Sequence, residues 1–118
     1  MIKIKALAAV GLVTASGAFA ATFSMTSRAG KTFTLETAQD RVTEAIESFS
    51  LCSDGVAAVK KVKLWMPEHG HGSSAVTVGA VQDGCRELTA INFTMTGSWE
   101  VRVEFTDGDS GKFDVDVE

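Results

Sequence analysis

The sequence predicts an all-β protein, an antiparallel β-sandwich of about seven short strands. Three observations predict this class of fold: apolar and polar residues alternate along the C-terminal third, turns containing glycine separate short segments, and branched or aromatic side chains fill those segments. Strands of this number and spacing fit a sandwich of the size of an immunoglobulin domain.

Residues 1–20 have the parts of a secretory signal peptide. Lys3 and Lys5 form its positive start, an apolar centre follows, and residues 18–20 (Ala-Phe-Ala) match the small-x-small pattern of a cleavage site. The apolar centre is too short to cross a bilayer comfortably, which favours cleavage over anchoring. We therefore expect one domain of residues 21–118, periplasmic or secreted, with no membrane span after signal cleavage.

The charge of that domain narrows the classes of function. The signal peptide carries two of the 11 basic residues and none of the 15 acidic ones, so nine basic residues and a net charge of −6 remain. Nucleic acid and anionic membranes are not expected as partners of an acidic domain, whereas cations are attracted to it. The chain has no Tyr and no Gly-x-Ser-x-Gly element, and its carboxylates are scattered. An enzyme is the least expected class.

The clearest secondary structure is a β-hairpin that closes the domain. Apolar and polar residues alternate over residues 99–105 and again over residues 113–117, and the turn-rich segment 107–111 connects them. Upstream strands are expected, in chain order, at residues 23–26, 32–37, 56–66, 75–81 and 88–95.

Residues 40–50 carry two conflicting patterns. Val42, Ile46 and Phe49 recur at helical spacing, and Asp40 is a suitable helix cap. Polar residues alternate with apolar ones toward Cys52, as in a strand that ends at a turn. The pattern alone leaves helix and strand equally open.

Cys52 and Cys85 are the two cysteines of the chain, and each lies next to an Asp-Gly turn. In an oxidising export compartment such a pair indicates a structural disulfide. Closing this loop is expected to stabilise the fold by roughly 3–4 kcal/mol. The Cys-x-x-Cys spacing of a redox site is absent, and a pair of thiolate metal ligands is the less favoured alternative.

The densest group of metal-binding residue types lies in residues 64–72 (Leu-Trp-Met-Pro-Glu-His-Gly-His-Gly). This segment holds both histidines of the chain, His69 and His71, together with Met66 and the only proline. Imidazole binds copper, zinc and nickel, and thioether sulfur favours Cu(I). The alternative is that Pro and Gly only shape a loop, and that the histidines lie there because loops are exposed.

Two motifs in order resemble a known family. Residues 65–72 (Trp-Met-Pro-Glu-His-Gly-His-Gly), followed by residues 92–101 (Asn-Phe-Thr-Met-Thr-Gly-Ser-Trp-Glu-Val), resemble the YtkA-like family of small exported domains. FixH-like proteins, which are associated with copper delivery to respiratory oxidases, share this plan. The resemblance covers roughly residues 44–117. It implies an immunoglobulin-like sandwich for the domain of residues 21–118, and it favours a strand at residues 46–52.

The family pattern also implies that Met95 lies close to the histidine segment. The candidate metal ligands are therefore Met66, His69, His71 and Met95. Two imidazoles and two thioethers suit Cu(I), whereas the histidines with Glu68 could hold Cu(II) or zinc. The expected function is copper binding or a metallochaperone role, with a periplasmic protein or copper acceptor as partner.

A second class of function stays open beside the first. A methionine on a strand is more often a core residue than a ligand, and Met66 and Met95 could pack beneath Trp65 and Trp99. The chain would then be a structural or protein-interaction module that binds no metal.

Overall fold

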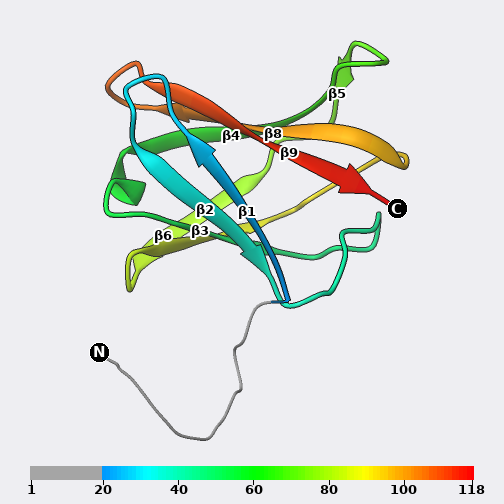
Figure 1. The fold of residues 1–118 in the computed structure, drawn as a ribbon, viewed down its shortest axis with the longest axis horizontal. Coiled ribbons are helices and arrows are strands. Elements are labelled where there is room, and N and C mark those ends of the chain that lie inside the picture. Colours follow the sequence, from blue (N-terminus) through cyan, green and yellow to red (C-terminus); the bar gives the residue numbers. More distant parts are fainter. Residues whose placement is uncertain (1–19) are drawn as a thin grey trace, which may run out of the picture.

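The computed structural model describes residues 20–118; apart from its last residue, the predicted signal peptide lies outside this range. The described chain folds into two antiparallel sheets packed face to face (Figure 1). The predicted all-β sandwich is confirmed, with nine strands in place of about seven. The finer immunoglobulin-like arrangement stays a prediction. Within the described residues, no helix has the length and apolar character needed to span a membrane.

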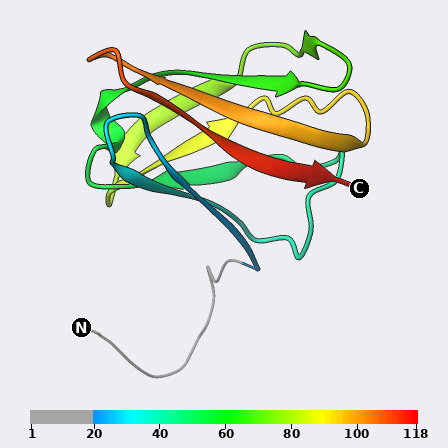
Figure 2. The ribbon, with the colours of Figure 1, turned by 45° about the horizontal axis from the view of Figure 1, so that its top comes forward.

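The two sheets form the two layers seen in Figure 2. The first sheet has the strand order β1-β2-β3-β7-β6, with β1 at Ala21–Thr26, β2 at Thr32–Thr37, β3 at Phe49–Cys52, β6 at Thr77–Gln82 and β7 at Cys85–Thr89. The second sheet has the order β5-β4-β8-β9, with β4 at Val59–Met66, β5 at His71–Gly72, β8 at Gly97–Phe105 and β9 at Ser110–Val117. The predicted closing hairpin is therefore confirmed as β8 and β9.

The core lies between the sheets because each strand directs alternate side chains inward. On β8 these side chains are Trp99, Val101, Val103 and Phe105, all of which are buried. Phe105 packs against Phe33 of the opposite sheet, with 4.9 Å between the ring centroids. Each large apolar side chain buried in this way stabilises the fold by about 1.5–3 kcal/mol relative to exposure.

The strand predicted over residues 88–95 is wrong in its second half. β7 ends at Thr89, and the following Ala90 has a φ of 57°, which turns the chain out of the sheet. Phe93 is nevertheless buried, and its ring packs edge-on against Phe49 and Trp99. The alternation in this segment therefore reflects packing on the core and not strand pairing.

Residues 40–50 form no helix, and the strand that the family resemblance favours is shorter than expected. β3 begins only at Phe49. Before it, Val42 forms an isolated parallel bridge with Val117, and the Ile46 N–H donates to the carbonyl of Thr43 at 3.1 Å. Val42 and Ile46 are both buried, so their helical spacing reflects two separate contacts with the core.

The strand predicted over residues 56–66 begins later than expected. Val56–Ala58 form a short 3-10 helix, η2, and β4 starts at Val59. Val56 is nevertheless buried, so this apolar residue contributes to the core from a 3-10 helix and not from a strand.

Cys52 and Cys85 form a disulfide, which confirms the prediction. They lie directly opposite each other on β3 and β7, with 4.0 Å between their Cα atoms. The bond therefore joins neighbouring strands of one sheet. The predicted turn before Cys85 is also present: Asp83 and Gly84 have φ values of 53° and 75°, as expected of a tight β-hairpin.

Asp109 connects the first hairpin of the chain to the last. Its Oδ1 accepts hydrogen bonds from the backbone N–H groups of Ala29 at 2.9 Å and of Ser110 at 2.8 Å. The Ser27 hydroxyl, these two N–H groups and the positive charge of Lys31 hold the pKa of Asp109 below its ordinary value of 3.8. The ionised carboxylate thus fixes the β1–β2 turn against the β8–β9 turn.

Replacement of Asp109 by Asn should weaken the acid sensitivity of the fold. A carboxyl whose pKa is lowered by folding stabilises the folded state above its unfolded pKa of about 4, and this contribution disappears as the pH falls through the lowered value. Asp109→Asn should therefore be less stable than wild type at pH 7 and lose less stability as the pH falls below about 4. Urea unfolding over this range measures the difference, with the exposed Asp40→Asn as control. Equal pH dependence of wild type and Asp109→Asn would contradict the assignment.

Candidate metal centre

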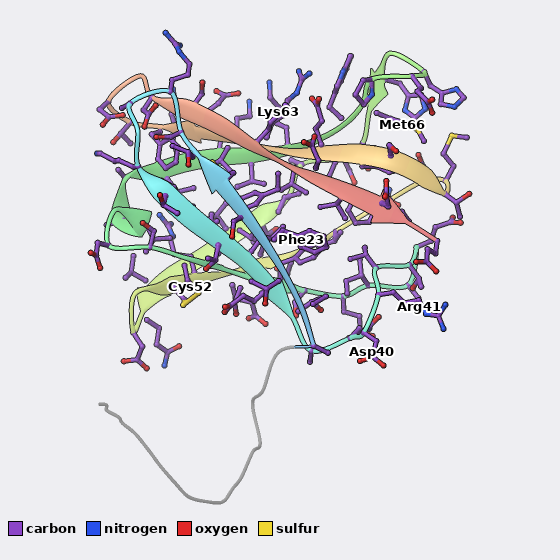
Figure 3. All side chains as sticks on the ribbon, viewed as in Figure 1. Phe23, Asp40, Arg41, Cys52, Lys63 and Met66 are labelled. Carbon is purple, nitrogen blue, oxygen red and sulfur yellow. A yellow bond between two sulfur atoms is a disulfide. The ribbon has the colours of Figure 1, made fainter. Side chains whose placement is uncertain are left out.

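The candidate site lies where β4 ends and β5 begins. Met66 is the last residue of β4 and pairs directly with His71, the first residue of β5. Because paired residues of an antiparallel ladder direct their side chains to the same face, His71 lies over the inner face of the sheet beside Met66. Figure 3 shows Met66 at the end of the molecule where β5 projects.

The turn between the two strands brings the histidines together. The N–H groups of His69 and Gly70 both donate to the carbonyl of Met66, at 3.2 and 2.9 Å. Gly70 has a φ of 63°, a conformation that glycine adopts without strain. Pro67 has no N–H to donate and fixes its own φ, so it suits the start of this turn. The chain therefore reverses within four residues and returns as β5.

The two imidazoles lie at a separation that one metal ion could bridge. The ring centroids of His69 and His71 are 5.8 Å apart, at an interplanar angle of 41°. Two imidazole nitrogens that share one ion at about 2.0 Å would place the ring centroids about 5 to 6.5 Å apart. The Nδ1 atom of His71 lies 3.2 Å from the carbonyl oxygen of Gly72, which leaves Nε2 as the free ligand atom of that ring when Nδ1 carries the proton.

Met95 belongs to the segment that directly precedes β8. Its side chain is 36% exposed, and its carbonyl accepts a hydrogen bond from the Trp99 indole N–H at 2.9 Å. The methyl group of Met66 lies against Gly97, where a Cβ atom would stand only 2.5 Å away from it. The Met66 side chain is thus directed toward the segment that carries Met95.

Trp99 lies between these two segments. The register that pairs Trp65 with Glu100 sets Met66 beside Trp99 on the inner face. The Trp99 ring is also 5.7 Å from the His71 ring, centroid to centroid, in an edge-to-face arrangement. From the sequence, Trp99 is expected to pack over Met66 and Met95. Its contacts with His71 and with the Met95 carbonyl depend on strand register and on a main-chain acceptor, which no pattern of residue types marks.

Three of the four predicted residues, Met66, His69 and His71, are therefore neighbours, and the backbone of Met95 is connected to them through Trp99. The four residues differ in exposure. Met66 is only 1% exposed, whereas His71 is half-buried, and His69 and Met95 are exposed. Within residues 20–118 no group of three or more His, Cys, Asp or Glu side chains is placed to hold a metal ion. Glu68 does not complete such a group with the histidines. A site here consequently needs thioether sulfur in addition to the two imidazoles.

Comparison of the chain with protein-family models, curated proteins and solved structures finds no match. The YtkA-like resemblance accordingly stays a prediction that rests on the two motifs.

Proposed function

We propose that this protein is an exported copper-binding domain that holds Cu(I) through the His/Met loop and carries it to an acceptor protein. The position of His71 supports this proposal most directly, because its ring lies close enough to His69 to share an ion and directly opposite Met66. Within residues 20–118 the two histidines have no third His, Cys, Asp or Glu ligand beside them, so Cu(II) and zinc should bind there more weakly than Cu(I). Two imidazoles with one or two thioethers are the ligands that Cu(I) prefers.

A role in transfer is supported by the place of the site in the fold. β5 has only two residues and pairs only with the end of β4, at the edge of the second sheet. His69 is exposed on the turn before it, so a partner could approach the ion from outside. The acidic surface expected of the mature domain would attract copper without requiring a buried cage.

A second function, a protein-interaction module without metal, is favoured by one observation. Met66 is almost fully buried and therefore also meets the description of a core residue. In that case the turn at residues 67–70 would serve as a contact surface, and its histidines would have no metal to bind.

Titration with Cu(I) separates the two functions. The double variant His69→Ala/His71→Ala should bind Cu(I) at least about 100-fold more weakly than the wild-type domain, since it loses both nitrogen ligands. Met95→Leu keeps the approximate size of the side chain and removes the sulfur. Its Cu(I) affinity should be about tenfold lower than that of wild type. Competition with a chromogenic Cu(I) chelator measures both affinities.

Glu68→Gln is the matched control, because it changes an exposed side chain in the same turn and should leave Cu(I) affinity unchanged. Thermal unfolding of each variant verifies that the fold is kept. If wild type binds Cu(I) no more tightly than the double histidine variant, the copper function is wrong and the interaction module takes its place.

A further inference from the structure

The two halves of the candidate copper site are separate in sequence, and Trp99 contacts both. One half is the β4–β5 turn with its histidines, and the other is the segment before β8 with Met95. The indole ring meets His71 edge-to-face, at 5.7 Å between centroids, and the indole N–H donates to the carbonyl of Met95 at 2.9 Å. Only 1% of the Trp99 surface is exposed.

The hydrogen bond to Met95 is well suited to fixing a segment without strand partners. Residues 90–96 follow the end of β7 and belong to neither sheet. A buried indole N–H needs an acceptor, and the Met95 carbonyl provides it. The same hydrogen bond restrains the backbone of Met95. Phe93 anchors the segment from the other side, with its ring centroid 5.3 Å from that of Trp99.

We propose that Trp99 is a positioning residue of the copper site, which acts by holding Met95 at the distance where its sulfur reaches an ion bound by His69 and His71. This inference rests on the proposed copper function. Trp99 should affect the position of Met95, the thioether ligand, and leave the two imidazoles in place. The imidazole half is formed by the β4–β5 turn, whose own backbone hydrogen bonds to Met66 shape it.

Trp99→Phe tests the proposal because it keeps an aromatic ring at this position and removes the N–H donor, together with part of the ring volume. Cu(I) affinity should fall about three- to tenfold, the effect of losing one net hydrogen bond. Cu(II), which binds imidazole and has little preference for thioether, should bind the variant and wild type equally. A general loosening of the fold would lower the affinity for both ions. A loss of Cu(I) affinity with unchanged Cu(II) affinity therefore identifies the positioning of Met95.

Two comparisons complete the test. Trp65→Phe is the matched control, because it makes the same change on the opposite face of the same sheet, where the ring meets the Arg102 guanidinium at 5.1 Å; it should leave Cu(I) affinity unchanged. In a Met95→Leu background, Trp99→Phe should have no further effect, since the residue through which it acts is already gone. Additive losses in the Trp99→Phe/Met95→Leu double variant would overturn the proposal.

A measurement on the wild-type domain keeps the proposal testable if Trp99→Phe does not fold. Cu(I) binding should slow hydrogen exchange of the Trp99 indole N–H, because a ligated Met95 holds its carbonyl in place. Unchanged exchange on Cu(I) binding would overturn the positioning role. If wild type binds no Cu(I) at all, the proposed copper function is wrong. If wild type and Trp99→Phe bind Cu(I) equally, only the positioning role of Trp99 is wrong.

Discussion

Replacement of both cysteines by alanine should lower the free energy of unfolding by about 3–4 kcal/mol, because the disulfide restricts the unfolded chain. Cys52 and Cys85 are 33 residues apart in sequence, and closing a loop of this length accounts for most of that value. For a domain of this size, the loss corresponds to a fall in melting temperature of about 15–20 °C. Thermal and urea unfolding of Cys52→Ala/Cys85→Ala, compared with oxidised wild type, measures it.

The same variant should keep its Cu(I) affinity when measured well below its melting temperature. Figure 3 shows Cys52 at the end of the molecule opposite to Met66, so the disulfide has no contact with the candidate site. A loss of Cu(I) affinity equal to that of the double histidine variant would show that the two regions are coupled. A change in stability below about 1 kcal/mol would show that the unfolded chain is already compact without the bond.

Replacement of Gly97 by alanine should destabilise the fold by about 2–4 kcal/mol, because two costs add at this position. Gly97 has a φ of 130°, which L-residues with a side chain rarely adopt. A Cβ atom at this position would also stand 2.5 Å from the methyl carbon of Met66, so the buried thioether would have to move. Cu(I) affinity should fall together with stability, since Met66 is a candidate ligand.

Two other glycines separate these costs. Gly108 has a φ of 88° and open space around it, so Gly108→Ala should show the backbone cost alone, about 1–2 kcal/mol. At Gly111, where φ is not positive, a Cβ atom would collide with the side chain of Met25, so Gly111→Ala shows the packing cost alone. If Gly97→Ala is no more destabilising than Gly108→Ala, the close contact with Met66 is not a significant constraint. Urea unfolding of the three variants gives the comparison.

The fold could be predicted from the sequence where a paired strand buries every second residue, because the sequence then alternates between apolar and polar residues. From Trp99 onward in β8 and from Phe113 onward in β9 every second residue is buried, so alternation and structure agree. Beyond Thr89 they disagree, because the left-handed conformation of Ala90 ends the strand and alanine gives no sign of it in a sequence. Around Val42 the pattern misleads for a similar reason, since contacts with the core can occur at helical spacing without a helix.

The residues of the candidate site could be predicted from the sequence, whereas the contacts between them could not. The group of His69, His71 and Met66 is visible as a motif, because all three lie within six residues. The contribution of Trp99 depends on the register of β4 with β8 and on a hydrogen bond to a main-chain carbonyl. Neither has a signature in residue types, so only the structure shows that the indole connects the two halves.

The contact between β1 and β9 has a consequence for the order in which the described chain folds. β1 and β9 belong to different sheets, yet Met25 lies against Gly111, and the Arg28 N–H donates to the carbonyl of Ser110 at 2.9 Å. The β1–β2 hairpin therefore completes its packing only when residues 109–111 are in place. Pairing between segments so distant in sequence is slow, so the contact between these two ends of the fold should form late in folding.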